Sequence, residues 1–178
     1  MTDDASEESY HLEGVAFGLA DGLIMCLGLI IGVAEVTADT RFVVIAGVIG
    51  GFANAFGNSI GFFMSQSAER ALQIHETTDH GKITRIHSRK EVLTNSIISF
   101  ISTVAAVGIL LAPFALLQMN EATILTFIVG SMMAFLLGSY TGRLCHENAF
   151  REGLKYAALA ILGAVISHFI ADLIQILV

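Results

Sequence analysis

Long apolar runs, separated by short charged segments, are the dominant pattern of this chain. Inside five of these runs a charged residue is either absent or single, as Asp21 is in the first run and Asp172 in the last. About 20 apolar residues in a helix, rising roughly 1.5 Å each, cross the hydrocarbon core of a bilayer. The pattern therefore predicts an all-α integral membrane protein with five transmembrane helices. We expect these helices at about residues 14–36, 42–66, 94–117, 122–142 and 156–178.

The polar segments predict a simple domain plan and an orientation. Residues 1–13 are acidic and lack Lys and Arg, so we expect a short disordered tail rather than a secretory signal. One transmembrane domain then covers residues 14–178, with a cytoplasmic loop at about 67–92. Eight of the nine basic residues follow the second or the fourth helix: Arg70, Lys82, Arg85, Arg89, Lys90, Arg143, Arg151 and Lys155. Basic segments stay in the cytoplasm, so we expect the N-terminus inside and the C-terminus outside.

Composition agrees with the membrane class and excludes others. The 178 residues are 54% hydrophobic and 14% charged, with a mean hydropathy of +0.74, whereas about a quarter of the residues in a soluble domain are charged. A buried soluble bundle is the alternative, which five such runs in a short chain disfavour. The formal charge of −7 argues against a basic nucleic-acid-binding protein. The sequence contains no Walker motif and no GxSxG motif, so it predicts neither an ATP-driven pump nor an enzyme, and no tightly bound cofactor.

Small residues and a proline predict how the helices pack. The first helix has glycines at i, i+4 and i+8, and similar stripes occur in the second and fourth helices; the first stripe is Gly14, Gly18 and Gly22. Such stripes let helix backbones approach closely in lipid. We expect a two-fold symmetric homodimer, although packing within one chain explains the stripes nearly as well. Pro113 should kink the third helix or end its regular part. Cys26 and Cys145 are expected to be free thiols.

Asp21 is the most informative polar residue. A carboxylate inside a membrane helix is costly and marks an ion or proton pathway, or else it caps a neighbouring helix. Met25 lies one turn away on the same face, and a carboxylate beside a thioether suits a borderline divalent metal such as Fe(II). Asn54 and Asn58 are also spaced i, i+4; they either present oxygens to a cation or hydrogen-bond between helices. These four residues form our predicted intramembrane metal site.

Two further groups contain ligands for a metal or a proton. His168 and Asp172 share a face of the fifth helix, where they could relay protons or bind metal, or simply snorkel. Together with Asp21 they form the predicted proton path. A second group of plausible metal ligands follows the second helix, with a solvated charged helix as the alternative: His75, Glu76, Asp79 and His80. Three acids make the outer mouth acidic, which favours cations there: Glu35, Asp39 and Glu121.

Three stretches resemble the vacuolar iron transporter family: FGLADGLIMCLGLIIGV, IAGVIGGFANAFGNSIGFFMSQSAE and AFLLGSYTGRL. The resemblance covers about residues 11–178. It implies a dimeric five-helix transporter that moves Fe(II), and often Mn(II), out of the cytoplasm in exchange for protons. The family's metal path lies at the dimer interface between helices 1 and 2, and its helix 1 aspartate matches Asp21.

The chain also departs from the pattern of this family. Gly50 and Phe62 stand where the family has glutamates, and Gly57 with Asn58 replaces a Ser-Met pair. Some members carry a long metal-binding insert between helices 2 and 3. In this chain the corresponding segment has only about 25 residues, as in the family's shorter branch.

Taken together, the sequence predicts a homodimeric exporter of Fe(II) or Mn(II) that works by proton antiport in a prokaryotic cell membrane. Its expected partners are a second copy, the lipid bilayer and divalent metal ions, with no nucleic acid. One alternative is a non-transporting membrane metal sensor or scaffold that binds metal through the cytoplasmic loop. Another is a carrier of a different cation, selected by the oxygens of Asp21, Asn54 and Asn58.

Overall fold

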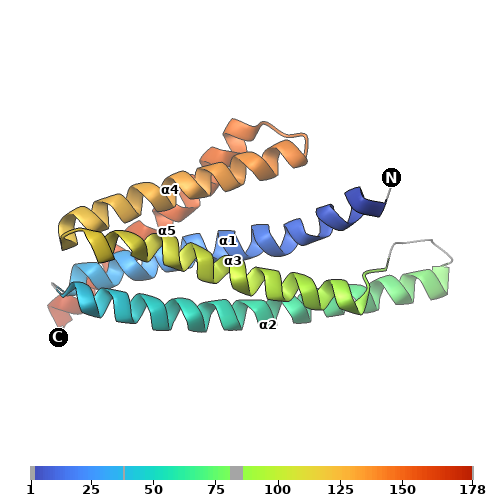
Figure 1. Ribbon diagram of the computed structural model, residues 1–178, viewed down its shortest axis with the longest axis horizontal. Helices are drawn as coiled ribbons and strands as arrows, with labels where there is room; N and C mark the ends of the chain where they lie inside the picture. The colour runs from blue at the N-terminus through green and yellow to red at the C-terminus, as the bar shows by residue number, and fades with distance from the viewer. Residues whose placement is uncertain (1–2, 38, 81–85, 178) are drawn as a thin grey trace.

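The computed structural model describes residues 3–37, 39–80 and 86–177, with the side chains of residues 3–11, 79 and 80 excepted. This part of the chain forms five α-helices and no strand (Figure 1): α1 (Asp3–Val36), α2 (Thr40–His80), α3 (Arg89–Leu116), α4 (Met119–Leu144) and α5 (Ala149–Leu177). Each helix contains a stretch long and apolar enough to cross a membrane. The predicted all-α fold with five transmembrane helices is therefore confirmed. The two termini lie at opposite ends of the bundle, as an odd number of spans requires.

Two helices extend beyond their predicted ends. α1 begins at Asp3, so the backbone from that residue is helical and the expectation of a disordered tail is wrong there. α2 continues to His80, past the predicted end at residue 66, and therefore occupies much of the expected loop at 67–92. This extension is rich in polar residues, and apolar periodicity does not detect a helix that lacks an apolar stripe.

The α2 extension is tied to the segment that precedes α3. Arg70 donates from Nε to the carbonyl oxygen of His87 over 2.8 Å, and the His87 backbone N–H donates to Gln73 Oε1 over 2.9 Å. The start of α3 is then closed by a capping box, in which Ser88 and Glu91 each accept from the other's backbone N–H. These bonds set where the polar extension of α2 ends and the third span begins.

The end of α3 follows from its proline. Pro113 lies in the last turn, where its carbonyl oxygen accepts from the Leu117 backbone N–H over 2.9 Å. Because proline has no N–H, it removes one hydrogen bond from a helix and favours termination nearby. The helix ends at Leu116, three residues past Pro113, close to where the sequence predicted either a kink or the end of its regular part. Cys26 and Cys145 are both free thiols, also as predicted.

α1 is the central helix and contacts all four others. A glycine stripe made of Gly14, Gly18 and Gly22 allows it to approach α3 closely. A Cβ atom at Gly18 would overlap the carbonyl oxygen of Ser99, and one at Gly22 would lie 3.1 Å from the backbone of Thr103. The Thr103 hydroxyl donates to the Gly18 carbonyl oxygen over 2.9 Å. The first stripe therefore serves packing within the protomer.

Glycines elsewhere divide into filled and open positions. Gly28 and Gly32 of α1 pack against Ser167 of α5, where an added Cβ would meet the serine side chain at 2.8 and 3.4 Å. At Gly57 and Gly61 of α2, in contrast, no atom of the described chain lies within 4 Å of an added Cβ. α2 thus leaves a strip of small residues open on the protomer surface.

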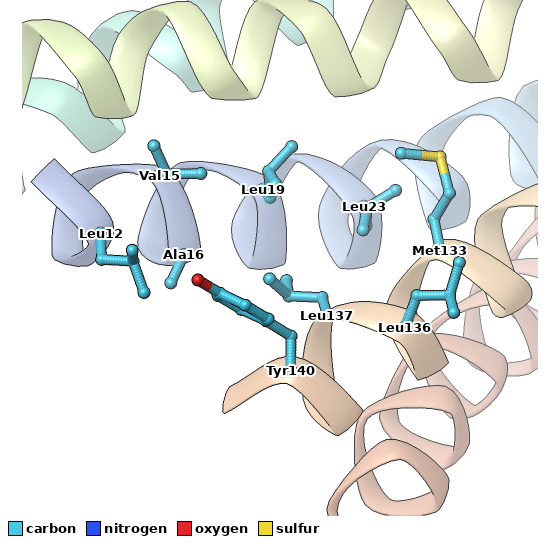
Figure 2. A pocket seen from close by; sticks show the side chains of 9 residues that line it. All are labelled: Leu12, Val15, Ala16, Leu19, Leu23, Met133, Leu136, Leu137 and Tyr140. Atoms are coloured by element: carbon cyan, nitrogen blue, oxygen red, sulfur yellow. The ribbon is translucent and has the colours of Figure 1, made fainter. Parts of the chain in front are cut away.

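An apolar pocket of about 290 Å³ lies between α1 and α4. Figure 2 shows the Tyr140 side chain of α4 reaching toward α1, with its hydroxyl beside Ala16 and with Leu137 of α4 near its ring. Its walls contain no charged side chain. A bare ion would not be stabilised in such surroundings, so this pocket is no candidate for a cation site.

Replacing Gly18 with alanine should destabilise the fold. The added methyl group would force α1 away from the Ser99 carbonyl, and overpacking of this kind costs about 1–3 kcal/mol. Gly108→Ala is the matched control, because an added Cβ meets nothing within 4 Å in the described chain. Thermal unfolding in detergent should show a lower Tm for Gly18→Ala only. Equal melting temperatures for the two variants would contradict the close α1–α3 approach.

Candidate metal centre

The strongest polar contact inside the apolar spans joins Asp21 of α1 to Asn54 of α2. The Asn54 amide donates from Nδ2 to Asp21 Oδ2 over 2.6 Å, and both side chains are half-buried. α1 and α2 are consecutive and antiparallel, so residues spaced by four along each helix meet in order along the contact. The two predicted ligands that the sequence placed on separate helices are therefore in direct contact.

A second polar pair lies nearer the N-terminal end of the same contact. Gln66 donates from Nε2 to Glu13 Oε2 over 2.8 Å, and Gln66 is only 4% exposed. Sequence reasoning treated Glu13 as the end of the tail and did not single out Gln66. The sequence does contain a signal for this pair, because residues spaced by multiples of about four lie on one face of a helix. Glu13 precedes Asp21 by eight residues, and Gln66 follows Asn54 by twelve.

Two aromatic rings separate these polar pairs. Phe17 lies midway between Glu13 and Asp21 along α1, and its ring stacks on that of Phe62 with centroids 4.6 Å apart and planes 18° apart. Phe62 stands at one of the positions where the chain departs from the family pattern. The α1–α2 contact thus alternates between a polar pair, an aromatic pair and the Asp21–Asn54 pair.

Asn58 provides a further polar group on the same side of α2. It lies one turn from both Asn54 and Phe62, and its Nδ2 is buried without a hydrogen-bond partner in the described chain. An asparagine amide can rotate to exchange its nitrogen and oxygen, so this side chain can offer an oxygen to a cation. The structure therefore brings Asp21 and Asn54 together, with Asn58 beside them as an unsatisfied amide.

Packing explains where Met25 lies and why Gly50 has no side chain. Met25 is 56% exposed and so lies at the protomer surface, on the same side of α1 as Asp21 but one turn further along. At Gly50, where the family has a glutamate, an added Cβ would lie 2.5 Å from Leu29 Cδ2. The Leu29 side chain thus fills the space that a longer residue would need.

The predicted cytoplasmic ligands lie on the polar extension of α2. His75 and Glu76 are exposed there, whereas the side chains of Asp79 and His80 lie outside the part of the chain that the structure describes. Because α2 continues through His80, His75 and Asp79 are one turn apart along the helix, and so are Glu76 and His80.

The predicted proton path is divided between two places. His168 and Asp172 lie near the C-terminal end of α5, beside Glu35 at the end of α1. Glu35 follows Asp21 by fourteen residues, which is about 21 Å along a helix. Within the described residues, then, His168 and Asp172 group with Glu35 and not with Asp21. The sequence noted Glu35 as part of an acidic mouth but did not connect it with α5.

Fold and site together define a multi-pass membrane protein with an ionisable group held between two of its helices. Residues 12–92 match the model of the VIT family, which confirms the resemblance to the vacuolar iron transporters. The match covers most of α1, all of α2 and the first turn of α3, so it falls on the helices that carry the site.

Two relatives extend this finding. The chain is 27% identical over 162 residues to an uncharacterized protein of Methanocaldococcus jannaschii, covering 86% of this chain and 84% of the relative. It is 32% identical over 79 residues to vacuolar iron transporter homolog 5 of Oryza sativa subsp. japonica, covering 44% of this chain and 38% of the rice protein. The similarity to the archaeal relative thus covers most of this chain, whereas the similarity to the rice relative covers less than half of it.

The Asp21–Asn54 hydrogen bond should be measurable as an energetic coupling. In a double-mutant cycle of Asp21→Ala and Asn54→Ala, we expect a coupling of about 0.5–1.5 kcal/mol, the range found for polar pairs in membrane helices. Asp21→Ala combined with Ser59→Ala serves as the control cycle, because the Ser59 hydroxyl donates to the Ser96 carbonyl oxygen instead. Unfolding in detergent provides the readout. Additive effects in the first cycle would show that the contact contributes nothing.

Proposed function

We propose that this protein is a transporter that exports a divalent transition metal, Fe(II) or Mn(II), from the cytoplasm in exchange for protons. The observation that carries the proposal is the Asp21 carboxylate, which lies inside an apolar span with a single amide donor. A carboxylate in a membrane helix is rare and marks an ion or proton pathway. The family match and the name of the rice relative support metal transport as the function. Transport also implies that the chain is not an enzyme.

The exchange chemistry follows from the ligands. A metal cation and a proton compete for the Asp21 carboxylate, because each binds the same oxygen lone pairs. Metal arrival would displace the Asn54 N–H and turn its amide oxygen inward, while Asn58 offers a second amide oxygen. Oxygen ligands with an optional Met25 thioether fit Mn(II) and Fe(II) better than softer ions. Protons that return to Asp21 from the outside would then release the metal.

The order of contacts along α1 suggests a route for the ion. Glu13 and Gln66 form a polar entry at the end of the bundle that the basic segments assign to the cytoplasm. The stacked rings of Phe17 and Phe62 lie between this entry and Asp21. Apolar constrictions gate ion paths by excluding water, so these rings would have to separate before metal reaches the site.

We further propose that the working unit is a homodimer whose two-fold axis runs beside α1 and α2. Asp21 is half-buried and Met25 is exposed in the protomer, so ligands on this side are open to a second copy. The open strip at Gly57 and Gly61 allows a neighbouring backbone to come close. A prokaryotic cell membrane is the proposed location, in keeping with the archaeal relative.

Metal flux tests the function directly. Proteoliposomes with an acidic lumen should take up Mn(II) or Fe(II) faster than vesicles without a pH gradient, and proton efflux should accompany uptake. Asp21→Asn should reduce the rate at least about tenfold, because it removes the charge that binds metal and proton. Glu147→Gln is the control, since Glu147 is an exposed acid in the segment between α4 and α5 and belongs to none of the predicted sites. Wild-type flux from Asp21→Asn would refute the proposed site, and metal binding without any flux would favour the sensor.

Disulfide formation tests the dimer. In a variant whose own cysteines are replaced, Gly57→Cys should cross-link two chains in the membrane under mild oxidation. Gly108→Cys, an equally open position on α3, should remain monomeric on a non-reducing gel. Cross-linking from Gly108→Cys alone would place the interface on α3 and overturn the α1–α2 arrangement.

A further inference from the structure

The structure assigns a second metal site to Glu35, His168 and Asp172, at the end of the bundle opposite the Glu13–Gln66 pair. Each of the three residues offers one ligand atom, and these atoms lie within 4.8 Å of one another. His168 Nδ1 is 3.3 Å from Glu35 Oε2, and His168 Nε2 is 3.7 Å from Asp172 Oδ2. The imidazole ring thus stands between two carboxylates from two different helices.

The backbone around the cluster is firmly positioned. Gly28 and Gly32 allow α5 to approach α1 at Ser167, the residue next to His168. One turn beyond Asp172, Gln175 donates from Nε2 to the Glu35 carbonyl oxygen over 2.8 Å. The cluster is therefore held between two contacts that fix the spacing of the helices, and its side chains alone need to move when a metal binds.

The ligand chemistry favours a transition metal. One imidazole with two carboxylates suits Mn(II), Fe(II), Co(II) or Zn(II), whereas Mg(II) and Ca(II) prefer oxygen ligands throughout. Ligands about 2.1 Å from a metal lie roughly 3–3.5 Å apart, so one ring nitrogen and the two carboxylate oxygens, which lie within 4.8 Å of one another, would have to close by up to about 1.3–1.8 Å. Small side-chain rotations achieve this, because each of the three side chains is 41–47% exposed.

The partial exposure of Glu35, His168 and Asp172 also affects how this site would bind an ion. The protein leaves part of each side chain uncovered, so further ligands can complete the coordination of a bound ion. The site lies about 21 Å from Asp21 along α1 and shares no residue with it. A metal released from Asp21 toward this end would therefore meet a second, shallower site before it leaves the protein.

Binding of Mn(II) to the purified full-length protein in detergent tests this assignment. The Asp21→Asn variant serves as the background, so that the intramembrane site does not contribute, and free Mn(II) is followed by its EPR signal. In this background we expect one bound ion per chain whose affinity falls at least about tenfold with His168→Ala, Glu35→Gln or Asp172→Asn. Glu147→Gln, which changes an exposed acid in the segment between α4 and α5, should leave the affinity unaltered.

A spectroscopic readout separates ligation from general attraction between charges. Pulsed EPR on the bound Mn(II) should detect a coordinated imidazole nitrogen, and His168→Ala should abolish that signal. Mn(II) affinity that is independent of His168, or a bound ion without nitrogen coupling, would overturn the assignment. The outcome is distinct from that for the proposed function, because loss of flux in Asp21→Asn leaves this site intact, whereas absence of the site leaves the flux through Asp21 untouched.

Discussion

The close approach of α1 to α3 is the constraint on which the rest of the structure depends. Because Gly14, Gly18 and Gly22 have no side chains, α1 can lie directly against the α3 backbone at Asn95, Ser99 and Thr103. The Thr103 hydroxyl also donates a hydrogen bond to the Gly18 carbonyl oxygen. Once this face of α1 is committed to α3, its neighbouring face is turned toward α2. Asp21, adjacent to Gly22 in the sequence, is thereby presented to Asn54. A packing rule for membrane helices thus determines where the charged residue lies.

The contact between α1 and α2 combines polar and aromatic side-chain pairs. Polar pairs stabilise charge inside an apolar span, whereas the stacked Phe17 and Phe62 rings place an apolar contact between the two pairs. In the family pattern a glutamate stands at the position of Phe62, and here Leu29 also fills the space beside Gly50. Along α1, the acids that contact a neighbouring helix are therefore Asp21 and, nearer the two ends, Glu13 and Glu35.

The five spans could be predicted because the absence of charge over about 20 residues depends only on the solvent. Asp21 could be recognised for the same reason, since it interrupts such a run. The pairing of Glu13 with Gln66 and of Glu35 with His168 could not, because it depends on which helices are neighbours and on their rotation. A charged helix after the second span was one of the sequence interpretations, but the end of α2 at His80 could not be predicted, because its polar residues form no apolar stripe.

The central claim is that Asp21 is where the metal binds inside the membrane, and anomalous scattering from crystals soaked with Mn(II) tests it most directly. The account predicts a peak about 2.2 Å from a carboxylate oxygen of Asp21, with the Asn54 amide turned so that its oxygen faces the ion. A map with a peak between Glu35 and His168 but none at Asp21, with the Asn54–Asp21 hydrogen bond intact, would contradict it.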